Sequence, residues 1–167
     1  MFTQQFRRPN GEKVNSEQII KIITNYILED TNCTYEFTVG TDSQNFDRTK
    51  MVEVIAVHRV GKGGIFFYNT EFIRRISSLR QKITEETQRS LAIADGLLEE
   101  LELSLMEYDI DINNLNIQFQ IHCDIGHDGK TKMLIKEITN WVQSYGYTCL
   151  IKPDSYTASG IANKYSK

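Results

Sequence analysis

The chain has 167 residues, of which 40 % are hydrophobic, a size and composition typical of one domain with a hydrophobic core. Nineteen basic and 22 acidic residues give a formal charge of −3, which excludes a strong overall attraction for nucleic acid, so any such binding must come from a local patch. The first residues lack the apolar stretch of a signal peptide, and no run approaches the roughly 18 apolar residues of a membrane span, so we expect a soluble cytoplasmic protein.

The first half of the chain predicts one helix and three strands. Residues Asn15 to Glu29 carry apolar side chains at helical spacing, behind a residue that can cap the first turn. The segment TYEFTVGTDSQ then alternates apolar and polar side chains, which indicates a strand that ends at Gly40 to Asp42. The β-rich runs MVEVIAVHRV and IFFYN are joined by Gly61 to Gly64, an arrangement typical of a hairpin.

The second half of the chain alternates helices and strands. A helix of roughly seven turns is expected from about Leu79, followed by a strand from Ile117 to Cys123. Apolar spacing then predicts a helix over Thr131 to Ser144, and Tyr147 to Ile151 is the last expected strand. Pro153-Asp154-Ser155 begins a short terminal helix.

This order predicts a single α/β domain over residues 1–167, with residues 1–30 as an N-terminal helical extension. Three meandering strands followed by two crossover units indicate a mixed five-stranded sheet, in the order βββαβαβα, with helices on both faces.

Two aspartates follow strands of this sheet. Asp42 ends the first strand and Asp124 ends the fourth, so their carboxylates lie side by side if the two strands are parallel neighbours. Each aspartate also shares parity with the polar side chains of its strand, which places both on the less apolar face. Asp42 taken alone is equally typical of a turn, because aspartate in T-D-S readily forms an Asx-turn.

The long helix offers a third carboxylate. Glu85 and Glu86 are adjacent, and only one of them can approach the sheet. At 100° per residue Glu86 lies at the flank of the apolar stripe, whereas Glu85 points nearly opposite, so we expect Glu86 to face inward. The small residues Ser90 and Ala94 one and two turns later allow a close approach of helix and sheet.

Three carboxylates gathered within about 4 to 5 Å repel one another by a few kcal/mol per pair, so such a cluster needs protons or cations. Ligation by oxygen alone favours Mg²⁺ or Mn²⁺ over Zn²⁺, and two such ions activate a water and stabilise the leaving oxygen of a phosphodiester. Asp154 is the candidate fourth ligand, since it directly follows the last strand. Its position is equally typical of a helix cap.

The chain resembles the ribonuclease-H-like superfamily, and within it the YkuK-like family. The matching segments are GTDSQ (40–44), HRVGKGG (58–64), EET (85–87), HCDIG (122–126) and IKPDSYTAS (151–159). The resemblance implies a metal-dependent nuclease in which Asp42, Glu86 and Asp124 hold divalent ions together with a terminal carboxylate. Many superfamily enzymes carry that last aspartate inside the terminal helix, where this chain has Asn163, so either Asp154 substitutes or the second metal is bound weakly or not at all.

The leading hypothesis is therefore a Mg²⁺- or Mn²⁺-dependent nuclease acting on RNA, DNA or an RNA–DNA hybrid. The alternative is a non-catalytic nucleic-acid-binding or regulatory module that keeps the fold without efficient two-metal chemistry, which Asn163 and the net negative charge favour. A basic chain end formed by Lys152, Lys164 and Lys167 is a further candidate contact for a phosphate backbone.

Overall fold

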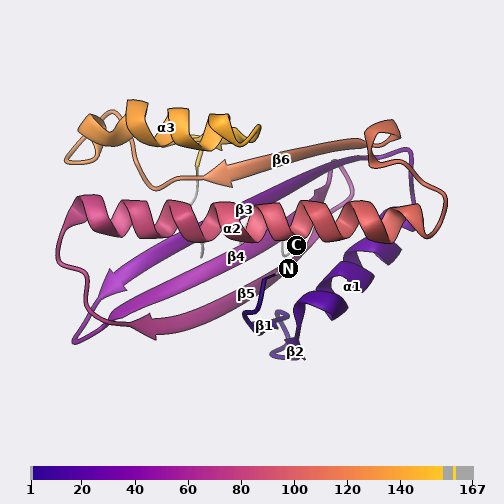
Figure 1. Cartoon of the computed structure of the whole chain (residues 1–167), viewed down its shortest axis with the longest axis horizontal. Helices are drawn as coiled ribbons and strands as arrows, with labels where there is room; N and C mark the ends of the chain where they lie inside the picture. The colour runs from indigo at the N-terminus through magenta and orange to yellow at the C-terminus, as the bar shows by residue number, and fades with distance from the viewer. Residues whose placement is uncertain (1, 156–159, 161–167) are drawn as a thin grey trace.

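Three long consecutive strands form the centre of the sheet. The computed structural model describes residues 2–155 and 160. In it β3 (Thr34–Asn45), β4 (Thr49–Arg59) and β5 (Gly64–Ile73) pair as an antiparallel meander. On the other side of β3 lies β6 (Asn116–His122), in parallel pairing, followed by the parallel strand β7 (Thr148–Leu150). The mixed sheet and the order of these elements confirm the expected α/β architecture (Figure 1).

The prediction of a five-stranded sheet is wrong, because the sheet has seven strands. The additional strands are β1 (Phe6–Arg7) and β2 (Lys13–Val14), which form a hairpin within the N-terminal extension. Arg7 pairs with Tyr68, so the hairpin extends the sheet beyond β5 in the order β2-β1-β5-β4-β3-β6-β7. Strands of two residues are too short to produce a recognisable period of two, and this is why the sequence pattern did not reveal them.

In the described part of the chain, α1, α2 and α3 pack against the sheet. α1 (Ser16–Leu28) begins with a capping box in which Asn15 and Gln18 satisfy each other's backbone N–H groups. α2 (Leu79–Met106) runs the length of the sheet, and the helix expected over Thr131 to Ser144 is divided into a 3₁₀ turn, η2 (Lys132–Leu134), and α3 (Ile135–Ser144). A second 3₁₀ turn, η1 (Ile112–Asn114), precedes β6. Within the described residues no helix has both the length and the apolar character needed to cross a bilayer.

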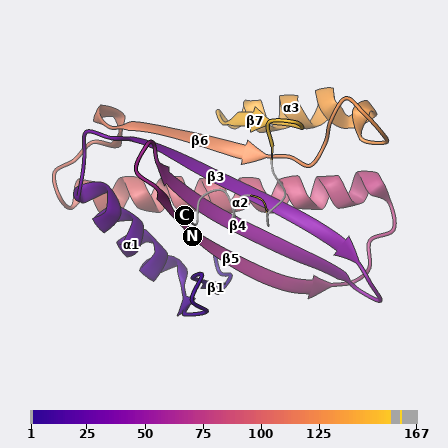
Figure 2. The same cartoon turned by 180° about the vertical axis from the view of Figure 1, so that it is seen from behind.

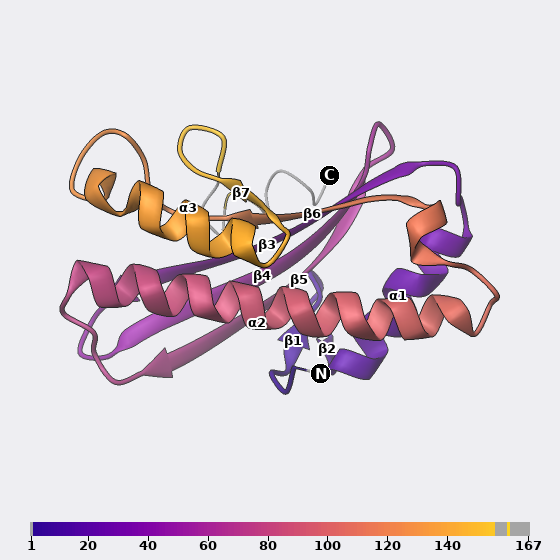
Figure 3. The same ribbon diagram turned by 45° about the horizontal axis from the view of Figure 1, so that its top comes forward.

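All three helices lie on one face of the sheet and share one hydrophobic core. Figure 3 shows α3 beside α2, and the hydroxyls of Thr24 in α1 and Ser104 in α2 are 2.8 Å apart. The opposite face carries a smaller apolar group, Val54, Ala56 and Phe66. The expectation that a helix also covers this second face depends on the terminal helix predicted after Pro153, and residues 156–159 and 161–167 lie outside the described part of the chain.

Polar contacts fix the first half of α2 over β3 and β4. The hydroxyls of Ser90 and Thr41 are 2.8 Å apart, and both side chains are buried. The preceding residue, Arg89, lies 3.5 Å from Glu53, whose side chain is fully buried, and 2.7 Å from Glu71 at the edge of the sheet. Glu53 also accepts hydrogen bonds from Asn69 and Gln4. These contacts determine where the neighbouring turn of α2, which contains Glu86, lies above the sheet.

The pairing of Arg89 with the buried Glu53 predicts a large loss of stability when the cation alone is removed. Arg89→Met leaves a carboxylate buried beside a helix without its cation, and we expect the free energy of unfolding to fall by about 3 kcal/mol. Urea denaturation of the purified variant measures this loss.

The double variant Arg89→Met/Glu53→Gln provides the control for this prediction. It removes both charges and keeps a polar side chain for Asn69 and Gln4, so it should recover part of the lost stability. A double variant no more stable than Arg89→Met would show that α2 is not held by this charge pair.

Candidate functional site

The site begins where the parallel pairing of β3 with β6 ends. The last paired residues are Gly40 and His122, so Asp42 and Asp124 each follow two residues later, side by side at the same edge of the sheet. Figure 2 shows the arrowheads of both strands pointing in the same direction, with that of β6 ending before that of β3. The expected placement of the two aspartates beside each other is therefore correct, although β3 continues to Asn45 instead of ending at Asp42.

The environment of Asp42 is electrostatically unfavourable for a carboxylate. Burial raises the pKa of Asp42, and the negative charge of Asp124 raises it further. A backbone N–H of Ser43 and the positive charges of Lys152 and Lys82 act in the opposite direction. The negative charge of Asp124 thus opposes the ionisation of Asp42.

Glu86 is the third member of this group. Its side chain is 6 % exposed and accepts a hydrogen bond of 2.5 Å from the Ser43 hydroxyl at Oε2. Burial, followed by the charges of Asp42 and Asp124, raises the pKa of Glu86 to about 8, against the opposing effects of Ser43 and Lys82. The expectation that Glu86, and not Glu85, faces inward agrees with this geometry, because Glu85 instead pairs with Arg89 at 2.8 Å.

The alternation of side chains explains how the carboxylates approach one another. Asp42 shares the face of Gly40 and Thr38, turned away from α2, whereas Ser43 faces α2 and contacts Glu86. The carboxylates therefore approach the edge of the sheet from its two sides. Among residues 2–155 and 160, no three histidine, cysteine, aspartate or glutamate side chains are close enough to hold a metal ion together.

A lysine lies against the acidic group. Lys152 Nζ is 2.8 Å from Asp124 Oδ1, and this contact raises the pKa of Lys152, with smaller contributions from Asp42 and Glu86. The backbone N–H of Lys152 donates to Ile125, and a Cβ added to Gly126 would lie 2.9 Å from Lys152 Cβ. The glycine of the HCDIG segment thus permits the close approach of the lysine.

Asp154 is not brought into this group by any interaction that the described residues show. It is exposed, in a turn where its backbone N–H donates to the Ile151 carbonyl. Besides burial, Asp124, Ser43 and Lys82 shift the pKa values of both Asp42 and Glu86, while Lys152 acts on Asp42 and Asp42 acts on Glu86. The role of Asp154 as a fourth ligand stays a prediction, and Asn163, Lys164 and Lys167 lie outside the described residues.

Sequence reasoning missed Ser43 and Lys82 and assigned Lys152 to a different role. Lys82 precedes Glu86 by four residues on α2, a spacing that signals a contact on one face of a helix. Ser43 lies two residues after Thr41, which faces the helix, so the alternation of side chains along the strand could have predicted that Ser43 faces the helix too. The contact between Lys152 and Asp124 depends on the loop after β7, for which the sequence carries no periodic signal.

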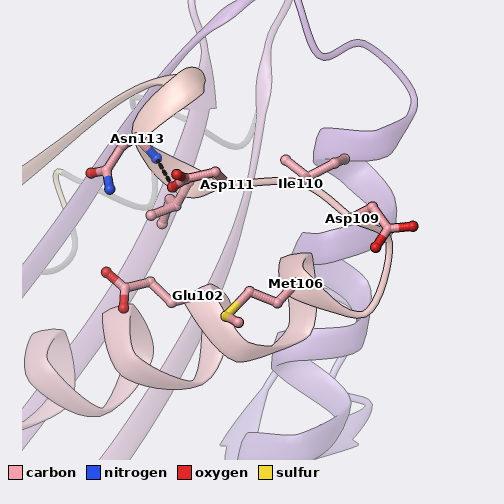
Figure 4. A pocket seen from close by; sticks show the side chains of 7 residues that line it. Glu102, Met106, Asp109, Ile110, Asp111 and Asn113 are labelled. Carbon is pink, nitrogen blue, oxygen red and sulfur yellow. Dashed lines mark hydrogen bonds between the residues drawn. The ribbon is translucent and has the colours of Figure 1, made fainter.

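A hollow of about 420 Å³ lies at the opposite end of α2, between Glu102 and Met106 of the helix and Asp111 of the η1 turn (Figure 4). Glu86 precedes Met106 by twenty residues, which corresponds to about 30 Å along the helix. The sequence between Arg89 and Lys130 contains no lysine or arginine. The hollow thus lacks the basic side chains that would attract a phosphate backbone, whereas Lys82 and Lys152 lie near the carboxylate group, which remains the candidate site.

The carboxylate group fits a hard divalent cation by its chemistry. Its three potential ligands offer only oxygen atoms, and one of them is a buried carboxylate whose ionisation the other two oppose. The lysine ammonium beside Asp124 shows that a positive charge is accommodated there. The assignment of Asp42, Glu86 and Asp124 as ligands of Mg²⁺ or Mn²⁺ stays a prediction.

Comparison with known proteins identifies the family of the chain. The family model described as "Ribonuclease H-like" matches residues 18–167. The chain is also 34 % identical over 157 residues to the "Uncharacterized protein YkuK" of Bacillus subtilis (strain 168), an alignment that covers 90 % of each chain. No solved structure was found that matches the chain. With nearly the whole sequence covered by the family model and by this relative, the chain belongs to the ribonuclease H-like family, in its YkuK-like branch.

Proposed function

We propose that this chain is a metal-dependent nuclease that hydrolyses phosphodiester bonds of RNA, DNA or an RNA–DNA hybrid. The observation that carries the proposal is the electrostatic interaction of Asp42, Asp124 and Glu86 at one edge of the sheet of a ribonuclease H-like protein. A carboxylate group of this kind is stabilised by a cation, and the superfamily's chemistry is directed at nucleic acid.

The residues of the site have separate tasks in this proposal. Asp42 and Asp124 provide oxygen ligands at adjacent strand ends, and Glu86 provides a third from the helix. Bound there, Mg²⁺ or Mn²⁺ supplies Lewis acidity towards the phosphodiester and lowers the pKa of the attacking water. Ser43 holds Glu86 in position through its hydroxyl. Glu86 gives up its proton when the cation binds, because its pKa of about 8 keeps it protonated at neutral pH otherwise.

Joint binding of one cation requires the three side chains to come closer together and Lys152 to leave Asp124. This requirement supports a second candidate function, a nucleic-acid-binding or regulatory module without catalysis. In that case Lys152 neutralises part of the charge permanently and the carboxylates hold no metal. The two candidates differ in whether the chain cleaves nucleic acid and whether Asp42 is needed for cleavage.

Cleavage assays with single-stranded RNA, single-stranded DNA and an RNA–DNA hybrid in Mg²⁺ or Mn²⁺ test the nuclease directly. Asp42→Asn and Asp124→Asn keep the size of each side chain but remove a negative ligand, so we expect rates to fall more than about 100-fold. Asp109→Asn, an exposed position at the far end of α2, is the matched control and should cleave at the rate of the unchanged chain.

Asp154→Asn in the same assay decides whether Asp154 acts as the fourth ligand. A comparable loss supports that role, and an unchanged rate removes Asp154 from the site. Cleavage that survives Asp42→Asn would exclude the proposed mechanism, whereas the absence of cleavage on every substrate would favour the non-catalytic module.

The affinity for Mn²⁺ should increase with pH up to about 8. Below the pKa of Glu86 a proton competes with the cation for the same carboxylate, so the affinity should fall by about tenfold per pH unit. Isothermal titration calorimetry in two buffers of different ionisation enthalpy measures both the affinity and the proton released. Glu86→Gln should bind more weakly and without this pH dependence over pH 6 to 8. An affinity of the unchanged chain that is constant over this range would contradict the assignment of Glu86 as a ligand.

The stability of the chain in EDTA should fall as the pH rises towards 8. The folded pKa of Glu86, about 8, exceeds its ordinary value of 4.5, so its contribution to stability is complete below pH 4.5 and is lost as the pH rises through 8. Glu86→Gln removes this dependence, and its free energy of unfolding should gain a few kcal/mol relative to the unchanged chain between pH 5 and pH 8. Glu99→Gln, exposed on the same helix, is the control, and equal pH profiles of all three proteins would contradict the burial of an ionisable Glu86.

A further inference from the structure

A surface of aromatic and basic side chains lies beside the carboxylate group, at the tip of the β3–β4 hairpin and the segment that joins β5 to α2. We refer to it as the hairpin patch and define it by Phe46, Arg48, Lys50, Phe72 and Arg74. The two phenylalanines are 54 % and 46 % exposed, and Arg48 and Arg74 are also exposed. Single exposed apolar side chains are common, but two exposed phenylalanines among basic side chains at one end of the sheet suit a contact surface.

The patch is held in a fixed shape. Thr49 at the start of β4 accepts a hydrogen bond of 2.8 Å from the backbone N–H of Ile76 and donates one of 2.7 Å to Asn45. Asn45 in turn donates to the Ile76 carbonyl at 2.9 Å, and Arg75 donates to the Phe46 carbonyl. These bonds connect the hairpin tip to the segment after β5. The two parts of the patch are therefore already positioned in the free protein, which lowers the entropy lost when a partner binds.

Within the patch, a guanidinium lies over an aromatic ring. The Cζ of Arg48 is 5.3 Å from the centre of the Phe72 ring, within the range of a cation–π contact. This contact orients both side chains and leaves the rest of the ring exposed. Phe46 precedes Arg48 by two residues in the hairpin tip.

The register of the strands relates the patch to the candidate site. Gln44, Lys50 and Phe72 form one row across β3, β4 and β5, and Asp42 lies in the next row on the same face. One row along a strand is about 7 Å and two strands across are about 10 Å, so Phe72 lies roughly 12 Å from Asp42 along the sheet. Figures 1 and 2 show the hairpin tip, the end of β5 and the start of α2 together at one end of the molecule. A polymer that contacts the patch therefore reaches the carboxylates.

The basic side chains are concentrated near the patch. The hairpin tip, the segment after β5 and the first turn of α2 carry Arg48, Lys50, Arg74, Arg75, Arg80 and Lys82, whereas no lysine or arginine occurs between Arg89 and Lys130, the stretch that includes the far end of α2. The basic residues at the β4–β5 turn, Arg59 and Lys62, are paired with Glu29 and Asp30. The net charge of −3 conceals this uneven distribution, which favours phosphate contacts beside the patch.

We propose that the hairpin patch binds single-stranded nucleic acid, with unpaired bases stacked on Phe46 and Phe72 and phosphates contacted by Arg48, Lys50 and Arg74. Aromatic side chains stack on bases only where these are unpaired, and neighbouring cations contact the backbone without sequence preference. This inference deepens the proposed nuclease function and rests on nucleic acid being its ligand, since it names the polymer and the surface that positions it beside Asp42.

Fluorescence anisotropy with labelled 20-mers of dT and U, and with a blunt 20-base-pair duplex, tests the inference in EDTA, where no cleavage interferes. Phe46→Ala/Phe72→Ala should weaken binding of the single strands at least about fivefold and leave the salt dependence unchanged. Tyr108→Ala/Tyr145→Ala, two exposed aromatics elsewhere, is the matched control and should bind as the unchanged chain does.

The basic side chains are tested by the salt dependence of the same binding. Arg48→Gln/Lys50→Gln/Arg74→Gln should reduce the slope of log affinity against log salt by about 2, because each contact with a single-strand phosphate contributes about 0.7.

The control for the basic side chains is Arg7→Gln/Arg8→Gln/Lys13→Gln in the β1–β2 hairpin. It removes the same charge from the edge strands beside the middle of β5, where Arg7 pairs with Tyr68 about 13 Å along the strand from Phe72, and should leave the slope nearly unchanged. Thermal unfolding midpoints within a degree or two of the unchanged chain verify that the variants fold.

Patch variants that bind single strands as tightly as the unchanged chain, controls that weaken binding equally, or a duplex that binds more tightly than either single strand would overturn the inference. The dT and U arms distinguish DNA from RNA. A chain that loses single-strand binding through the patch variants but cleaves nothing in Mn²⁺ supports this inference and rejects the nuclease. Cleavage that depends on Asp42 while the patch variants bind normally supports the nuclease and rejects this inference.

Discussion

The parallel pairing of β3 with β6 is the constraint on which the candidate site depends. Its register places Gly40 opposite His122, and therefore Asp42 beside Asp124 where the pairing ends. Parallel neighbours require a long crossover, and α2 provides it by returning along the whole face of the sheet. The same connection that makes the two strands parallel thus brings Glu86 to their ends. A one-residue change of register would turn one aspartate to the other face and separate the charges.

Glu86 is held in a position that is unfavourable for its ionised carboxylate. Burial and two nearby carboxylates raise its pKa to about 8, so the site contributes unfavourably to folding whenever Glu86 is ionised. The neighbouring turn supplies the opposing interactions, namely the ion pairs of Arg89 and the buried contact of Ser90 with Thr41. Because these contacts fix α2 next to the acidic group, the helix can hold Glu86 in a position that its charge alone would disfavour. This separation of scaffold from site is expected of residues selected for chemistry.

The periodic spacing of side chains along strands and helices predicted which face of each element the carboxylates occupy. The parity of Asp42 and Asp124 and the helical phase of Glu86 could be obtained from the sequence, because strands repeat every two residues and helices every 3.6. The two-residue strands β1 and β2 contain no full period, so the width of the sheet could not be predicted. The ion pair of Lys152 with Asp124 depends on the path of a loop. The hairpin patch was missed for a related reason, since Arg48 and Phe72 come into contact only after β3, β4 and β5 have paired.

If the proposed function holds, the hairpin patch supplies the attraction for nucleic acid that the carboxylates lack. A group of three acidic side chains repels a phosphodiester, and the repulsion is strongest where the cation that would compensate it is absent. Attraction must therefore come from another surface within reach, and the basic residues of the hairpin patch lie on the face of Asp42. Stacking on exposed aromatic rings adds an attraction that is insensitive to charge and requires unpaired bases. The chain can thus be acidic overall and still hold a polyanion over an acidic site, provided that the contacts are local and the polymer is single-stranded.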